Sequence, residues 1–376
     1  MRRPITLSII SCLLFLTACK GPAGRTVLTD AEEISMKYAS LLTLQEGNGF
    51  ILAQISNPWD STRILHSYVL VPSGQEVPEN LPQGTVVRTP VKRGVFYTSV
   101  HTSLINQLGA YSCIAGVCDS EYMYLEKLQN DLKSGKITDC GNSVTPDMER
   151  IIDLSPDAIL LSPFENSGSY GKLGNLGIPI IECADYMETS PLGRAEWMRF
   201  YGLLTGTEAA ADSLFDRIEG NYNALKAKAS GSPVKPSVIV EKKFGSAWYV
   251  PGANSTVGQL LADAAADYIF KDEQASGSVP YDPEIVFDRS HDAEIWMLKY
   301  NQDVPLTYRQ LEQEWSAYAS MKAFENRNIY VCNTSCSSFY EETPFHPDLL
   351  LNDYIKIFHP EIIPDGKLNY YKKMEE

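Results

Sequence analysis

The sequence lacks the common signatures of catalytic and metal centres. Histidine occurs only five times in 376 residues, and no pair has the His-Glu-x-x-His spacing of zinc metalloproteases. A Gly-x-Ser-x-Gly elbow and a Gly-Lys-Ser/Thr phosphate loop are also absent. We therefore predict no catalytic residue, no resident metal and no cofactor, although a triad assembled in space from distant residues would escape this search.

Acidic residues outnumber basic residues, and no long apolar run follows the N-terminal segment. The chain has 32 Lys and Arg against 47 Asp and Glu, so its formal net charge is −15. This balance argues against nucleic acid as a partner, because phosphates require a basic surface. It equally argues against a body that lies flat on anionic lipid.

The first nineteen residues are typical of an export signal. Arg2 and Arg3 precede an apolar run over 5–16, which ends in Leu16-Thr17-Ala18-Cys19. The run is shorter than the roughly 20 residues that span a membrane. Its end resembles the lipobox of bacterial lipoproteins, which implies a signal peptide over 1–18 and acyl chains on Cys19. The alternative is an ordinary signal peptide that contains a cysteine. We expect a lipid-anchored chain on the periplasmic side of a bacterial membrane, inner or outer.

Six cysteines follow Cys19, and an oxidising compartment permits disulfides between them. They are Cys113, Cys118, Cys140, Cys183, Cys332 and Cys336. Fifteen pairings exist for six cysteines, so connectivity is not determined. A Cys118–Cys140 bridge would close the loop between a predicted strand and the next helix, and a sharp turn would allow Cys332–Cys336. A buried thiol is the alternative at each position.

The N-terminal part after the signal predicts a tether and a small sheet. Residues 19–30 contain Gly and Pro and indicate a tether. Residues 31–93 predict a small antiparallel β prelude, in which Asn48-Gly49 marks a hairpin. Its expected strands are Leu41–Gln45, Phe50–Ser56, Ile64–Val71 and Thr85–Thr89.

From residue 94 onward, strands alternate with helices, which indicates an α/β fold with mainly parallel sheets. We divide this part into an N-terminal α/β lobe over 94–190, a long linking helix over 191–230 interrupted at Gly206, and a C-terminal α/β lobe over 231–376. The expected strands are Val95–Val100, Ile114–Val117, Ala158–Leu161, Ile180–Cys183, Ser237–Val240, Ile295–Leu298 and Ile329–Val331.

Several segments in this part resemble the class III periplasmic binding proteins, the solute receptors of ABC importers for cobalamin and iron–siderophore complexes. The segments are 98–110, 147–160, 176–180, 191–194, 252–261, 281–286 and 347–361. The resemblance covers about Gly94 to Glu361 and excludes the prelude. It implies two Rossmann-like lobes joined by a long backbone helix, with a ligand cleft between the lobes.

The resemblance also implies site residues. Glu149 and Glu284 occupy the positions at which the family's glutamates, one on each lobe, meet arginines of the permease. Alternatively, each glutamate only stabilises the first turn of its helix. The residues that we predict to contact ligand lie at strand ends, helix starts and aromatic turns. They are Ser99, His101, Trp248, Tyr249, Tyr281, Phe339 and Tyr340.

These observations predict a monomeric, lipid-anchored receptor that captures an iron chelate of siderophore or haem type. It would deliver this small-molecule ligand to an ABC permease dimer in the inner membrane. A cobalamin or corrinoid receptor is the close alternative. The alternative from another class is a tetrapyrrole-processing enzyme or chelatase with the same two-lobed fold. His101 is the only visible candidate for its catalytic residue.

Overall fold

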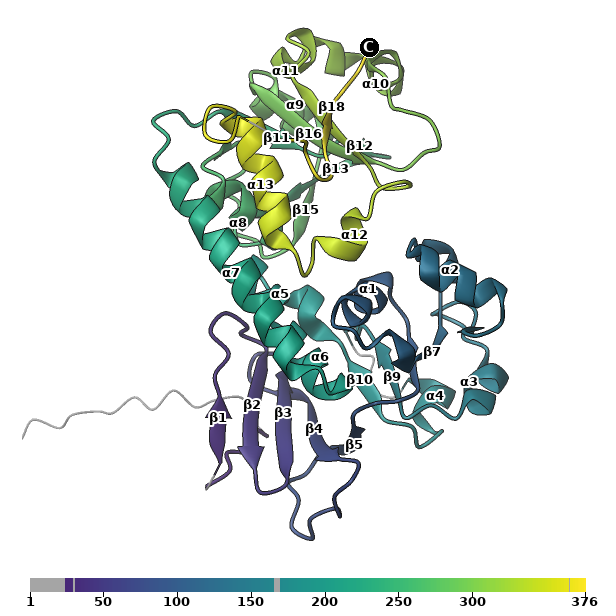
Figure 1. Ribbon diagram of the computed structural model, residues 1–376. Helices are drawn as coiled ribbons and strands as arrows, with labels where there is room; N and C mark the ends of the chain where they lie inside the picture. Colours follow the sequence, from purple (N-terminus) through teal and green to yellow (C-terminus); the bar gives the residue numbers. More distant parts are fainter. Residues whose placement is uncertain (1–23, 30, 166–169, 365) are drawn as a thin grey trace, which may run out of the picture.

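The computed structural model describes residues 24–29, 31–165, 170–364 and 366–376. The predicted signal peptide, Cys19 and half of the tether lie outside the described residues. Figure 1 shows three parts: a sheet from the N-terminal region, an α/β lobe beside it, and a second α/β lobe at the far end of a long helix.

The N-terminal sheet has the strand order β1-β2-β3-β4-β5. The first four strands form an antiparallel meander, and Gly49 adopts a positive φ of 83° in the β2–β3 hairpin. The fifth strand pairs parallel with β4, so the prediction of a purely antiparallel prelude was wrong. The connection over 73–84 is long enough to cross back, as a parallel pair requires. The strands are β1 (Glu32–Ile34), β2 (Leu42–Gly47), β3 (Phe50–Ser56), β4 (Ile64–Pro72) and β5 (Thr85–Thr89).

Two buried glutamates attach this sheet to the helices that link the lobes. The Glu196 carboxylate accepts hydrogen bonds from the backbone N–H groups of residues 37–39. The Glu188 carboxylate accepts from the N–H groups of Ser40 and Leu41 and from the Trp197 indole. These charge-assisted hydrogen bonds hold residues 37–41, between β1 and β2, against the segment that contains Glu188 and Glu196.

The N-terminal lobe contains a parallel sheet in the order β10-β9-β6-β7-β8. The predicted strand 95–100 was too long, because Thr98 caps a helix and places Ser99 and Val100 inside it. The strands are β6 (Gly94–Phe96), β7 (Ile114–Val117), β8 (Thr138–Asp139), β9 (Ala158–Leu161) and β10 (Ile180–Glu182). The helices are α1 (Ser99–Gln107), α2 (Glu126–Lys133), α3 (Met148–Leu154) and α4 (Gly171–Gly174).

Three helices, not one interrupted helix, join the lobes. They are α5 (Pro191–Glu196), α6 (Met198–Thr205) and α7 (Glu208–Ser230). Gly206 ends α6 in a left-handed conformation with φ of 69°, where a side chain would be strained. A Cβ on Gly202 would lie 2.7 Å from the Ala211 Cβ, so glycine permits α6 and α7 to pack closely. We keep 94–190, 191–230 and 231–376 as the proposed divisions of the two-lobed part.

The C-terminal lobe contains two sheets. The larger one has the order β14-β11-β16-β17-β18 and is parallel except at β18, and the smaller one is the antiparallel β12-β13-β15. The strands are β11 (Ser237–Val240), β12 (Lys243–Phe244), β13 (Ala247–Pro251), β14 (Asp267–Tyr268), β15 (Ser278–Tyr281), β16 (Ile295–Tyr300), β17 (Ile329–Asn333) and β18 (Lys372–Lys373). The helices are α8 (Thr256–Asp263), α9 (Pro283–Ser290), α10 (Tyr308–Glu314), α11 (Lys322–Glu325), α12 (Phe339–Glu342) and α13 (Pro347–Phe358).

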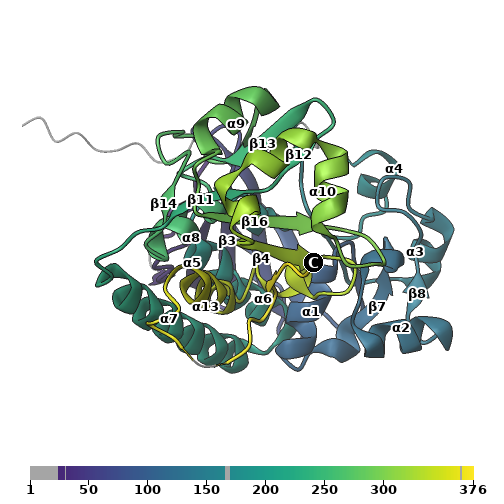
Figure 2. The same ribbon diagram turned by 90° about the horizontal axis from the view of Figure 1, so that it is seen from above.

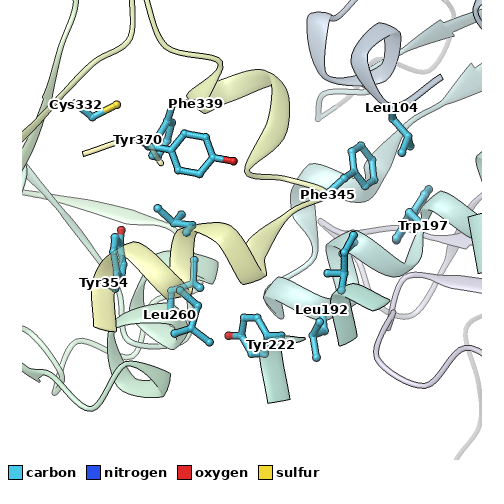
Figure 3. Close-up of a cluster of buried hydrophobic side chains, with 14 of the residues drawn as sticks. Leu104, Leu192, Trp197, Tyr222, Leu260, Cys332, Phe339, Phe345, Tyr354 and Tyr370 are labelled. Atoms are coloured by element: carbon cyan, nitrogen blue, oxygen red, sulfur yellow. The ribbon is translucent and has the colours of Figure 1, made fainter. Parts of the chain in front are cut away.

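A continuous apolar core runs from one lobe into the other. Figure 3 shows Leu104 of α1, Phe345 and Trp197 close together, and farther along the same cluster Tyr222 of α7 lies near Leu260 of α8. Each large buried apolar side chain stabilises the fold by roughly 1.5–3 kcal/mol relative to an exposed one. The lobes are therefore joined by packed side chains as well as by chain connections, and Figure 2 shows α7 and α13 lying alongside one another.

Candidate functional site

The two lobes meet where helices follow the carboxyl ends of their parallel strands. Helix α1 follows β6 of the N-terminal lobe, α12 follows β17 of the C-terminal lobe, and the two helices pack together (Figure 1). In open α/β sheets, ligands bind outside the carboxyl ends of the strands. This seam is therefore the candidate functional site.

Polar contacts cross the seam in the present conformation. The Tyr124 N–H donates to Glu341 Oε1 at 2.8 Å, and His346 Nε2 lies 2.5 Å from Gln107 Oε1. Burial raises the pKa of the Glu341 carboxyl above its ordinary value. These few contacts close one side of the seam, and separation of the lobes would break them.

Helix α12 carries two of the predicted ligand residues, Phe339 and Tyr340. The Phe339 ring is buried and makes an edge contact with Tyr370 at a centroid separation of 5.7 Å. The Tyr340 side chain remains 55 % exposed. The prediction of Phe339 as a ligand contact was therefore wrong for this conformation, whereas Tyr340 remains a predicted ligand contact with an exposed ring.

A half-buried ion pair that the sequence analysis did not predict lies beside α12. Lys299 of β16 pairs with Glu241, which directly follows β11, and Lys299 Nζ lies 5.5 Å from the Phe339 ring centroid. Burial disfavours the charged ammonium, but Glu241 outweighs this effect and raises the pKa of Lys299, so the lysine stays charged. One indication of this pair was present in the sequence, because Glu241 and Lys299 each directly follow the carboxyl end of a predicted strand.

Among the β13 and β15 aromatics, one predicted ligand residue is unavailable. The Trp248 side chain is fully buried against Trp296 and Tyr318, and its Nε1–H donates to the Val240 carbonyl at 3.1 Å. The prediction of Trp248 as a ligand contact was therefore wrong for this conformation. Alternation along β13 turns the next residue, Tyr249, to the opposite side, where it is 45 % exposed.

Tyr281 is half-buried and already has partners. Its hydroxyl donates to Glu273 Oε2 at 2.6 Å, and its ring contacts Phe270 at a centroid separation of 5.2 Å. Ser99 lies in the first turn of α1 and is also half-buried. Both residues remain predicted ligand contacts, and they lie in different lobes.

His101 is a buried structural residue, which corrects its prediction as a ligand contact. Its Nε2 lies 2.9 Å from Asp185 Oδ1 and 3.0 Å from the Tyr201 hydroxyl, and its Nδ1 faces Thr98 Oγ1 at 2.5 Å. Burial lowers the pKa of His101, but Cys183 and Asp185 outweigh burial and raise it to about 10. The imidazolium is thus saturated by protein partners and has almost no exposed surface.

The predicted Cys118–Cys140 disulfide is absent, and both residues are free buried thiols. They lie at the ends of the neighbouring parallel strands β7 and β8, where the Cys140 N–H donates to the Val117 carbonyl at 2.7 Å. Burial raises the pKa of each thiol to about 12, so both are protonated at neutral pH. Cys332 and Cys336 are free thiols as well.

Glu149 and Glu284 occupy matching places on the two lobes. Each is exposed in the first turn of a helix, α3 or α9, and the residue two positions before it caps that helix. Asp147 Oδ1 accepts from the Glu149 N–H at 3.1 Å, and Asp282 Oδ1 accepts from the Glu284 N–H at 2.9 Å. Because the aspartates already cap the helices, the glutamate side chains are left to solvent.

The described residues contain neither a metal-binding cluster nor a membrane-spanning helix. No group of three or more His, Cys, Asp or Glu side chains there is arranged to hold a metal ion. Likewise, no described helix is both long and apolar enough to cross a membrane.

Known proteins resemble this chain over most of its length. An uncharacterised lipoprotein of Methanocaldococcus jannaschii is 26 % identical over 298 residues, which are 77 % of this chain and 70 % of the relative. A periplasmic heme-binding protein of Pseudomonas aeruginosa has a TM-score of 0.58 at 14 % identity and covers 76 % of this chain and 99 % of its own. A protein of the Fe3+-hydroxamate transport system of Saccharomonospora viridis has a TM-score of 0.54 at 17 % identity, with coverages of 73 % and 94 %.

The structural matches show the fold alone, because their sequence identities are only 14–17 %. The family described as periplasmic binding protein matches residues 95–335, which is more than half of the chain and leaves the N-terminal sheet outside. That match begins within β6 and ends just after β17, so it includes the parallel strands of both lobes and the linking helices, but not β18 or α13. The chain is therefore a member of the periplasmic binding protein family, as the sequence motifs predict.

Proposed function

We propose that this chain is a lipid-anchored receptor that captures an iron chelate of siderophore or haem type and delivers it to an ABC importer. Membership of the periplasmic binding protein family supports a solute-binding role. The matches to a heme-binding protein and to a hydroxamate transport protein favour an iron chelate.

The observation that carries this proposal is the composition of the seam beside α12. An exposed Tyr340 ring lies on the helix that follows β17, and a charged lysine, Lys299, lies behind it. Aromatic faces provide rigid contact area for flat macrocycles and catecholates. Lys299 is paired with Glu241, so the exposed aromatic surface, and not a net positive charge, supports this ligand class.

This geometry supports two other functions less well. A corrinoid receptor needs the same kind of aromatic surface, so the ligand titration below distinguishes it. A tetrapyrrole-processing enzyme would need an accessible acid or base, and His101 is enclosed by Asp185 and Tyr201. Burial of the only candidate residue disfavours the enzyme.

Delivery would use Glu149 and Glu284 as contacts to a permease dimer in the inner membrane. Exposed carboxylates on both lobes can set the orientation of docking and raise the encounter rate with basic pockets. An anchor at Cys19 would keep a monomeric receptor on the periplasmic side of its membrane, close to that permease. The lipobox resemblance and the lipoprotein relative support the anchor.

The deciding experiment identifies the ligand. The purified protein is examined for co-purifying chromophore by absorbance and mass, then titrated with haem, cobalamin and ferric siderophores. Micromolar or tighter binding of haem or a ferric siderophore is expected. Tight binding of cobalamin alone would favour the corrinoid receptor. If none of the three ligands binds, the chain shares only its fold with the iron-chelate receptors, and the proposed ligand class is wrong.

A further inference from the structure

A cavity of about 710 Å³ lies between the N-terminal sheet and the N-terminal lobe. Its size is within the range of about 300–1,000 Å³ that is typical of small-molecule sites. Residues of β4 and β5 form one wall, and residues 177–182, leading into β10, form the other. None of the seven predicted ligand residues lines it, so it is separate from the seam at α1 and α12.

The floor of this cavity is a fixed polar network. Glu182, the last residue of β10, has a side chain that is only 5 % exposed. Its Oε1 accepts from the Tyr170 hydroxyl at 2.6 Å, and its Oε2 lies 3.1 Å from His66 Nδ1. His66 Nε2 in turn lies 2.8 Å from Thr85 Oγ1. Because these groups satisfy one another across the junction, the floor is rigid before any ligand arrives.

Apolar side chains surround that floor, and several remain in contact with solvent. Trp59, Ile178 and Pro179 line the cavity. Phe164, which is 63 % exposed, and Val86 of β5 complete the apolar lining. Exposed apolar side chains gathered around a hollow mark binding surfaces, since water contact with them is unfavourable.

The same cavity has one exposed guanidinium in its lining. The Arg63 side chain, just before β4, forms no hydrogen bond or ion pair with any described residue. A guanidinium presents paired donors that match a carboxylate, and its plane stacks on aromatic rings. Hydrogen bonds from Thr62 and the Arg63 charge lower the pKa of the neighbouring Asp60 carboxyl, but among the described residues no hydrogen bond joins the guanidinium to that carboxyl, so the Arg63 side-chain donors are open to an incoming carboxylate.

We propose that this cavity binds a small planar aromatic anion, with its ring against the apolar lining and its carboxylate paired with Arg63. The N-terminal sheet lies outside the family match and supplies half of the lining, so the site is an addition to the two-lobed receptor. The proposal does not depend on which solute binds at the seam between the lobes.

Three probes of equal size and different charge test the proposal in the purified protein. They are naphthalene-2-carboxylate, naphthalene-2-methanol and 2-naphthylmethylamine, each titrated by calorimetry. We expect the carboxylate to bind at least fivefold more tightly than the alcohol, and the amine most weakly. Equal affinities, or no binding at millimolar probe, would overturn the proposal.

Matched variants locate the bound probe. Arg63→Gln should remove the preference for the carboxylate, whereas Arg309→Gln, at an exposed position on α10, should leave it unchanged. Val86→Trp should obstruct the cavity with an indole ring and weaken all three probes at least tenfold, with the melting temperature reporting that the variant is folded. Loss of binding in Tyr340→Ala, with none in Val86→Trp, would place the probe at the seam and refute this site.

Discussion

Tyr68 of the N-terminal sheet bridges two backbone groups on the free edge of the neighbouring lobe. Its hydroxyl donates to the Ile180 carbonyl at 3.0 Å and accepts from the Glu182 N–H at 2.8 Å. β10 is the edge strand of its sheet, and an unpaired edge is a template for unwanted strand pairing. One side chain therefore covers this edge and joins the added sheet to the lobe.

Tyr68→Phe should destabilise this junction. The change leaves a buried carbonyl and a buried N–H without their shared partner, which costs about 1–3 kcal/mol. Urea unfolding should show this loss, and hydrogen exchange at the Glu182 amide should become faster. The exposed Tyr122→Phe serves as control and should change stability little. Unchanged exchange at Glu182 would contradict the bridging role.

The His101–Asp185 pair should make stability depend on alkaline pH. The folded-state pKa of His101 is about 10, above its ordinary value of 6.5, so the contribution of the imidazolium is complete below about pH 6.5 and lost as pH rises through 10. Burial raises the pKa of Asp185, but His101 and then Arg194 hold it below its usual range, so the carboxylate's contribution is lost only in acid.

His101→Gln should therefore lower the free energy of unfolding by about 3–5 kcal/mol near pH 6, since it leaves Asp185 buried without its nearest cation. The variant should also lose much of the decline in stability between pH 6.5 and 10. His291→Gln, at the exposed end of α9, is the matched control. Parallel stability curves for the wild type and His101→Gln would exclude the ion pair as the cause.

Charge reversal at the docking positions should stop delivery without affecting capture. Glu149→Arg together with Glu284→Arg should reduce uptake of the bound chelate more than tenfold, because like charges would then face the permease. Ligand affinity of the purified variant should stay within twofold of wild type. Glu126→Arg, which changes an exposed glutamate in the first turn of α2, controls for charge alone. Normal uptake by the double variant would refute docking and favour a scavenging or sensing lipoprotein.

Removal of the Tyr340 ring should weaken capture. Tyr340→Ala deletes an exposed aromatic face, and aromatic contacts contribute about 0.5–1.5 kcal/mol beyond their buried area, so the Kd should rise threefold to tenfold. Trp248→Phe should leave the Kd unchanged while lowering stability, because Trp248 is a core residue. An effect of Trp248→Phe on affinity that equals that of Tyr340→Ala would contradict this assignment.

Most strands and several helices could be predicted from the sequence. Phe50–Ser56, Ala158–Leu161, Ser237–Val240 and the helix Pro347–Phe358 lie where their patterns place them. Helices α2 and α10 were missed, since they are short and polar. The family was also predicted from ordered motifs, because several short segments in the right order are more specific than any one of them.

The candidate site was predicted only in part. Tyr249 and Tyr340 expose their rings as a ligand contact requires, but Trp248, Phe339 and His101 are buried. Strand alternation assigns Trp248 and Tyr249 to opposite faces, yet it does not say which face a neighbouring element covers. Trp296 and Tyr318, distant in sequence, bury Trp248.

The sequence by itself therefore determined the order of most strands, the two-lobed α/β class and the family, since these follow from local periodicity, turn residues and motif order. Only the tertiary structure decided the parallel pairing of β5, the burial of His101 against Asp185, the Lys299–Glu241 pair and the cavity at the added sheet. Each of these joins residues far apart in the chain, and long-range packing, not local propensity, selects such partners.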